Sequence, residues 1–83
     1  SEFSPKVREL CESSRELLED CLAVAYNGGA MRLNNVIEKH GENWDETRTV
    51  IKRKRRFPKN ELTPQTRIYL RKLREIRKLE KEQ

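Results

Sequence analysis

The sequence contains little of what builds membrane spans, metal centres or flexible linkers. Its 83 residues include one tryptophan, two tyrosines, two phenylalanines, three glycines, three prolines and a single histidine. No apolar run approaches the roughly 18 residues that a transmembrane helix requires, and no signal peptide is visible. Because one histidine and two cysteines do not complete a four-ligand zinc site, we expect no metal, no cofactor and no membrane partner.

The two cysteines, Cys11 and Cys21, are predicted to be free thiols. If both lie on one continuous helix, ten residues separate their Cα atoms by about 15 Å, whereas a disulfide tolerates no more than about 7 Å. Free, buried thiols are typical of a reducing compartment such as the cytosol or the nucleus.

Charge is what the sequence has in abundance. Charged residues make up 40% and hydrophobic residues 34%, a composition that on its own leans towards disorder. The net charge of +5 is nevertheless small for this length, and the apolar residues recur at helical spacing, which favours a folded domain. Residues 1–27 hold six acids and three bases, whereas residues 28–83 hold sixteen bases and eight acids. The basic part is therefore expected to recruit the partners.

We predict an all-α fold, a compact four-helix arrangement with short loops, with helices at about 4–27, 30–40, 43–56 and 63–81. Ser1-Glu2-Phe3 resembles a cloning remnant, and residues 4–83 are expected to form one helical domain excised from a larger protein. The first helix carries an apolar seam that continues through Ser14. Gly28-Gly29 and Gly41 are expected to end the first and second helices.

Two segments, Ser4-Pro5 and Thr63-Pro64, have the form of an N-cap followed by a first-position proline. Both also match proline-directed phosphorylation sites, so the two interpretations stay open. The helix N-terminus already explains each pair without a modification. A phosphate on Thr63 would stabilise the helix that follows it.

Five consecutive cations, Lys52 to Arg56, are followed at once by Phe57-Pro58-Lys59. On a helix with about 100° per residue such a run surrounds the cylinder, so it cannot lie on one solvent face. It indicates a helix end, an anionic partner or a nuclear-import signal. Lys54 falls in line with the buried stripe that starts at Trp44. Either its side chain extends past the edge of the core to reach solvent, or the helix stops early or projects beyond the domain, and we favour the last two.

The last predicted helix has two opposite faces. Helical geometry places Arg67, Arg71, Arg74, Lys78 and Lys81 on one narrow ridge, and Ile68, Tyr69, Leu73, Ile76 and Leu79 on the other side. We expect the apolar side to pack on the core and the cationic ridge to face outward. The ridge then either follows a row of phosphates or an acidic peptide, or is a solvated face supported by intrahelical ion pairs.

No catalytic arrangement is visible. Both thiols lie in the hydrophobic seam, where burial raises a thiol pKa, and the acids of the first helix have no polar cleft. The glycine pair lacks the spacing of a phosphate-binding loop. We therefore predict that the protein is not an enzyme.

These observations favour a helical protein-interaction domain of a nuclear, chromatin- or transcription-associated protein, which docks an acidic or amphipathic partner segment. The alternative is direct binding of DNA or RNA through phosphate contacts, and a third class is a homodimer formed through the first helix. Trp44 and Phe57 are possible anchors. The predicted partner- or phosphate-binding residues are Lys52, Arg53, Lys54, Arg55, Arg56, Lys59, Arg67, Arg71, Arg74 and Lys78.

Overall fold

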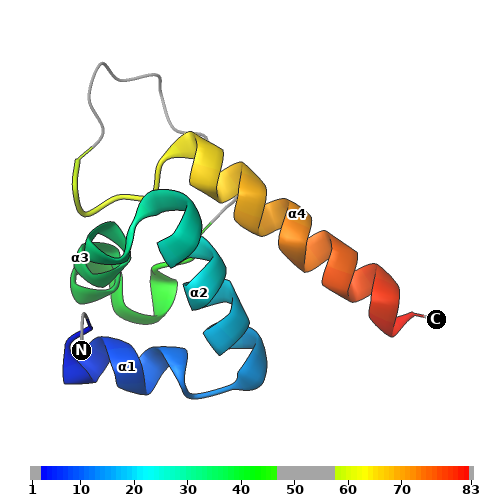
Figure 1. Ribbon diagram of the computed structural model, residues 1–83, viewed down its shortest axis with the longest axis horizontal. Coiled ribbons are helices and arrows are strands. Elements are labelled where there is room, and N and C mark those ends of the chain that lie inside the picture. Colours follow the sequence, from blue (N-terminus) through cyan, green and yellow to red (C-terminus); the bar gives the residue numbers. More distant parts are fainter. Residues whose placement is uncertain (1–2, 47–57, 83) are drawn as a thin grey trace.

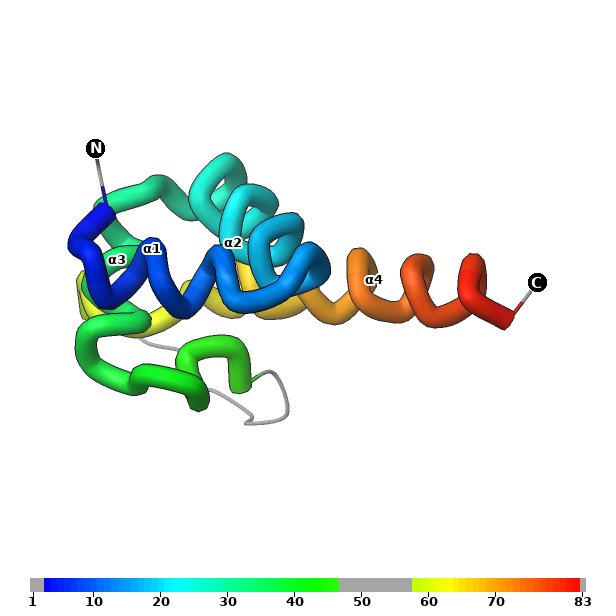
Figure 2. The backbone as a smooth tube through the Cα atoms, turned by 90° about the horizontal axis from the view of Figure 1, so that it is seen from below, coloured from blue at the N-terminus to red at the C-terminus, as the bar shows by residue number. Residues whose placement is uncertain are grey.

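The computed structural model describes residues 3–46 and 58–82, which contain four α-helices, one short 3₁₀ helix and no strand. The helices are α1 (Pro5–Cys11), α2 (Arg15–Gly28), α3 (Ala30–His40), η1 (Gly41–Asn43) and α4 (Pro64–Lys81). The predicted all-α class is confirmed. Figures 1 and 2 show α1, α2 and α3 gathered into one body, from which the second half of α4 extends.

The prediction of a single helix over residues 4–27 is wrong, because the chain breaks between α1 and α2. Ser14 has extended backbone angles, φ −151° and ψ 159°, and its hydroxyl accepts a hydrogen bond from the Leu17 amide at 3.0 Å. Ser14 is thus the N-cap of α2 and does not continue the apolar seam. Ser13 reinforces the break, since its hydroxyl donates to the Leu10 carbonyl at 2.7 Å.

This break also overturns the prediction of free thiols. Cys11 ends α1 and Cys21 lies on α2, and the turn between the helices brings their Cα atoms to 6.0 Å, where the two residues form a disulfide. The expectation of free thiols assumed one straight helix and therefore an excessive separation. A disulfide is typical of an oxidising compartment. The prediction of a nuclear location thus loses the support of the thiols and rests on the basic run.

The core lies where α1, α2 and α3 meet, and it is closed by residues on either side of segment 47–57. Trp44 and Leu62 approach it from the two ends of that segment, and Leu70 is the main apolar contribution of α4. Phe3, Leu10, Leu17 and Ala25 pack against its edge. The buried hydrophobic residues are Val7, Cys11, Cys21, Val24, Leu33, Val36, Ile37, Trp44, Leu62 and Leu70.

The predicted helix ends at glycine and the predicted caps are confirmed. Gly29 has a φ of 95° and separates α2 from α3, and Gly41 has a φ of 59° at the end of α3. Both values lie in the region that favours glycine. The Ser4 hydroxyl accepts a hydrogen bond from the Val7 amide, and the Thr63 hydroxyl accepts one from the Thr66 amide.

The predicted helix over residues 43–56 falls mostly outside the described residues. Its described part is not α-helical, because η1 ends at Asn43 and a turn follows. The described chain on both sides of segment 47–57 is held firmly. Asp45 accepts a hydrogen bond from Arg74 at 2.5 Å, and Arg32 donates to the carbonyls of Pro58 and Glu61 at 2.6 and 2.8 Å.

The predicted orientation of α4 is wrong. Leu70 and Thr66 are buried, but from there onward the cationic side of the helix turns towards α2 and the apolar side faces solvent. The two helices run antiparallel, since Thr66 donates to Asn27 while Arg77 and Lys81 contact Asp20 and Glu16 further along. The reason is that α2 offers a row of acids at this contact, which attracts the cationic side.

Candidate functional site

The net charge of the protein is concentrated in one short segment. The described residues hold thirteen bases and thirteen acids, and segment 47–57 holds six bases and no acid. Glu2 is the remaining acid, which gives the total of +5. The described body is therefore neutral. The excess of positive charge therefore belongs to residues 47–57, which include the run Lys52 to Arg56.

The structure divides the predicted binding residues into three groups. Lys52, Arg53, Lys54, Arg55, Arg56 and Phe57 lie outside the described residues. Lys59, Arg71 and Lys78 are exposed. Arg67 and Arg74 are turned towards the body, so the expectation that the whole ridge faces outward is wrong for these two residues.

Arg67 pairs with Glu61 at 3.7 Å and donates to the carbonyl of Leu62. Arg74 instead belongs to a cluster centred on Asp20, which is only 2% exposed. Its carboxylate accepts hydrogen bonds from Arg74 at 3.0 Å and from Arg77 at 2.8 Å. Arg77 also pairs with Glu19, and Lys81 pairs with Glu16 at the far end of the contact. The cluster holds α4 against α2, and its charged groups are paired with one another.

The electrostatics of this contact follow from the same hydrogen bonds. The hydrogen bond with Asp20 raises the pKa of Arg77, and the hydrogen bond from Lys81 lowers the pKa of Glu16. Both shifts stabilise the charged forms. No buried side-chain nitrogen or oxygen among the described residues lacks a hydrogen-bond partner. The contact between α2 and α4 is therefore an ionic network in which every described buried polar side-chain atom has a partner. A depression of about 380 Å³ lies against it and is lined in part by Asp20, Arg74 and Arg77.

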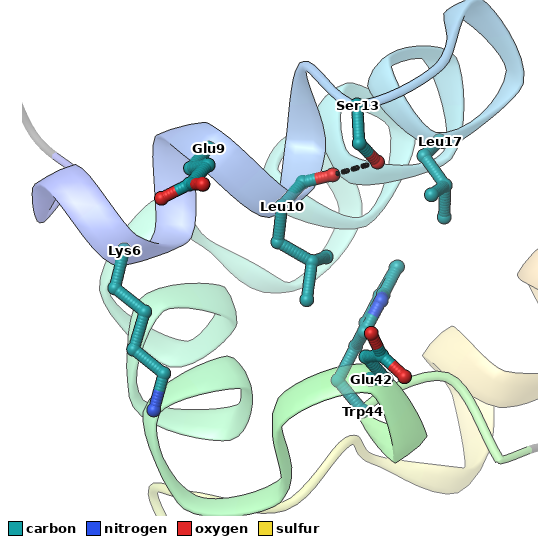
Figure 3. A pocket seen from close by; sticks show the side chains of 7 residues that line it. All are labelled: Lys6, Glu9, Leu10, Ser13, Leu17, Glu42 and Trp44. Atoms are coloured by element: carbon teal, nitrogen blue, oxygen red, sulfur yellow. Dashed lines mark hydrogen bonds between the residues drawn. The ribbon is translucent and has the colours of Figure 1, made fainter.

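A groove of about 460 Å³ lies between α1, the start of α2 and η1. Figure 3 shows Leu10 and Leu17 pointing towards the ring of Trp44, with charged and hydroxyl side chains around them. We call it the Trp44 groove, and its lining residues are Lys6, Glu9, Leu10, Ser13, Leu17, Glu42 and Trp44. The groove offers an apolar floor with a polar rim, the usual form of a site for an apolar side chain of a partner.

Trp44 forms the floor of this groove and does not protrude from it. The ring is 2% exposed, in agreement with the expectation that it packs on the core. The groove was not predicted, because Leu10 and Leu17 were expected to lie on a single helix. The signal was the Ser13-Ser14 pair before Arg15-Glu16, which marks a helix start. No such signal identifies Lys6, Glu9 or Glu42.

The groove and the basic run are close along the chain. Lys52 follows Trp44 by eight residues, so chain length alone keeps it within about 29 Å of the groove. Asp45, the residue after Trp44, is fixed to Arg74 by a hydrogen bond of 2.5 Å, and the described chain continues as far as Glu46. A partner that reaches both features has to combine acidic residues with an apolar side chain.

Two searches for other kinds of site bear on the described residues only. They contain no group of three or more histidine, cysteine, aspartate or glutamate side chains positioned to hold a metal ion. None of the described helices combines the length and the hydropathy of a membrane span. A comparison with protein families, curated proteins and solved structures finds no match to this chain.

Proposed function

We propose that this chain is a non-enzymatic protein-interaction domain that docks an acidic, amphipathic segment of a partner. The observation that carries the proposal is the separation of charge. The described body has no net charge, whereas the segment that follows the groove residue Trp44 in the sequence holds six cations. Lys52 to Arg56 attract the acidic residues of the partner, and the Trp44 groove receives an apolar side chain.

The two features have different physical roles. Exposed cations raise the rate of encounter, and their effect falls steeply with ionic strength because the Debye length is about 10 Å at 0.1 M salt. Burial of one leucine-sized side chain contributes about 1.5–3 kcal/mol, which is a factor of about 10 to 100 in affinity. The run therefore supplies attraction, and the groove selects among acidic partners.

The location proposed for this interaction is the nucleus, in a protein associated with chromatin or transcription. The proposal rests on the run Lys52-Arg53-Lys54-Arg55-Arg56, which is similar to a nuclear-import signal. The disulfide between Cys11 and Cys21 counts against it, since such bonds persist mainly in oxidising compartments. Imaging of the protein in cells with and without the run tests the nuclear location. Thiol labelling in cells tests whether Cys11 and Cys21 are joined there.

Direct binding of DNA or RNA is the alternative function. The phosphates would contact the run together with Lys59, Arg71 and Lys78, which are exposed. The engagement of Arg67 and Arg74 with acids of the body favours the protein partner, because only part of the ridge is left for phosphates.

The test compares two peptides of equal negative charge, an amphipathic acidic helix with leucines along one side and a polyglutamate without apolar residues. We expect the amphipathic peptide to bind at least about tenfold more tightly to the wild type. R55A/R56A should weaken both peptides and flatten the salt dependence. R8A/R15A is the matched control, because it also removes two exposed cations that belong neither to the predicted binding residues nor to the Trp44 groove. L17A should reduce only the preference for the amphipathic peptide.

The outcomes distinguish the functions. Equal binding of the two peptides overturns the role of the Trp44 groove. Duplex DNA that binds more tightly than either peptide, with a salt slope that falls by about one for each removed cation, supports the alternative. Thermal unfolding of each variant shows whether a loss of binding reflects a loss of folding.

A further inference from the structure

The face of α4 that points to solvent carries large hydrophobic residues, although a solvent-exposed face usually carries polar or charged ones. Eight large hydrophobic residues of the described chain are exposed, and four of them, Ile68, Tyr69, Ile76 and Leu79, belong to this one helix. Since the cationic side is held by the acids of α2, rotation of the helix cannot bury them. Figure 2 shows that the last turns of α4 extend well beyond the other helices, so this face is open to a partner.

Four residues form a continuous stripe along that face. Ile68, Lys72, Glu75 and Leu79 follow one another at spacings of four, three and four, which places them within about 60° of one another around the helix. Ile68 is 50% and Leu79 is 55% exposed. Lys72 and Glu75 are exposed, and neither is joined to another described residue by a salt bridge or a side-chain hydrogen bond. We call these four residues the α4 stripe.

The α4 stripe is complementary to a second copy of itself that runs in the opposite direction. The pair Ile68 and Leu79 and the pair Lys72 and Glu75 are both centred between Leu73 and Arg74. An antiparallel copy of the helix therefore places each Ile68 opposite Leu79 and each Lys72 opposite Glu75 of the second copy. A parallel copy places Lys72 opposite Lys72 and Glu75 opposite Glu75, which is repulsive.

We propose that the α4 stripe is a self-association surface, on which a second copy of this chain docks antiparallel about a twofold axis between Leu73 and Arg74. Such an interface uses the same patch on both chains and closes at two copies. The surface is separate from the Trp44 groove, which lies on other helices, so the inference does not depend on the proposed function.

The homodimer expected from the sequence used a different surface. Val7, Cys11 and Cys21 of the first-helix seam are buried in the core and are not available to a second copy. One helix from each chain makes a small interface, at or below the low end of about 1,200 Å² for stable complexes. We therefore expect a dimer with a dissociation constant in the micromolar to millimolar range.

Sedimentation equilibrium of wild type, K72E, E75K and an equimolar mixture of the two variants tests the proposal. K72E alone places two glutamates opposite each other, and E75K alone does so with two lysines. Each variant should therefore dimerise about tenfold more weakly than wild type. In the mixture, Lys and Glu again face each other, and the heterodimer should form at least as readily as the wild-type dimer. This rescue occurs between chains, so a change within one helix cannot imitate it.

The matched control is the charge-reversed pair R8E, on α1, and E12R, at the C-cap of that helix. Mixing these two variants should produce no additional dimer. Unfolding curves of all variants confirm that each is folded. A wild type that remains monomeric up to about 1 mM overturns the self-association. A mixture that associates no better than its components overturns the antiparallel register.

Discussion

Two helices, α3 and α4, pack against the same helix α2, yet they bury opposite kinds of surface. α3 contributes Leu33, Val36 and Ile37 to the core, all at most 1% exposed. α4 contributes Leu70 and Thr66 near its start, and after that mainly Arg74, Arg77 and Lys81. Both helices are amphipathic in sequence. The comparison teaches that amphipathicity gives a helix two faces but does not select the one that meets its neighbour.

The surface of α2 selects which face of each helix packs against it. α2 presents Cys21 and Val24 towards the core, and it presents Glu16 and Asp20 towards α4. Removal of apolar surface from water stabilises the contact with α3, at roughly 25 cal/mol per Å². The contact with α4 depends on ion pairs, most of them partly exposed, which contribute less each. α3 should accordingly be the more firmly held of the two helices.

The largest effect is expected at the apolar contact. L33A removes a fully buried side chain of α3 and leaves a cavity, so it should lower the free energy of unfolding by about 3 kcal/mol. Urea denaturation at two salt concentrations measures the loss, which should not depend on salt. M31A on the same helix is the control, since Met31 is 74% exposed and its truncation should be nearly neutral. An equal loss of stability for L33A and M31A would contradict the conclusion that burial of apolar side chains holds α3.

The charged contact should respond less strongly. D20N keeps the shape of Asp20 but removes the charge that Arg74 and Arg77 share. We expect a loss of about 1–3 kcal/mol, below that of a fully buried ion pair, because Arg74 keeps Asp45 and Arg77 keeps Glu19. Amide hydrogen exchange should show the opening at α4 and not at α3. E80Q, an exposed change on α4, should leave both helices protected as in wild type.

The smallest effect concerns the ionic link between α3 and the chain that enters α4. Lys39 and His40 lie 2.8 and 2.9 Å from the Glu61 carboxylate. The hydrogen bond from Lys39 lowers the pKa of Glu61 below its ordinary value of 4.5, with a further contribution from His40. Because the folded value is the lower one, this stabilisation is present above pH 4.5 and is lost as the pH falls through the folded value.

E61Q removes this pH dependence. Wild type should lose about 0.5–1 kcal/mol more stability than E61Q between about pH 5 and pH 3, as measured by urea unfolding at each pH. E80Q serves again as the control and should follow wild type. Parallel pH profiles of wild type and E61Q would show that the link between α3 and α4 contributes nothing to folding.

Much of the local structure was predictable from single residues. Ser4 and Thr63 act as caps because their hydroxyls replace a missing backbone acceptor, and Gly29 and Gly41 end helices because they adopt a positive φ. These effects need only the neighbouring residues. Ser14 has the same chemistry as Ser4, but its position inside an apolar seam led to the prediction of a continuous helix.

The candidate site was predictable only in part. The basic run Lys52 to Arg56 is visible in the sequence, and its role as a binding surface stays a prediction. The Trp44 groove depends on the break between α1 and α2, which moves Leu10 and Leu17 to the same side as Trp44. Ile68 and Leu79 of the α4 stripe were assigned to the core side, because an apolar face was expected to pack inward.

The sequence by itself determined that the chain is helical, where three of its helices begin or end, and that its excess charge belongs to one segment. These properties follow from backbone sterics, local hydrogen bonds and composition, all of which act over a few residues. Only the tertiary structure decided that Cys11 meets Cys21, that Asp20 gathers Arg74 and Arg77, and that α4 shows its apolar side to solvent. Those outcomes depend on residues that are far apart in sequence and meet only in the folded chain. There, charged and apolar side chains compete for contact with the same helix.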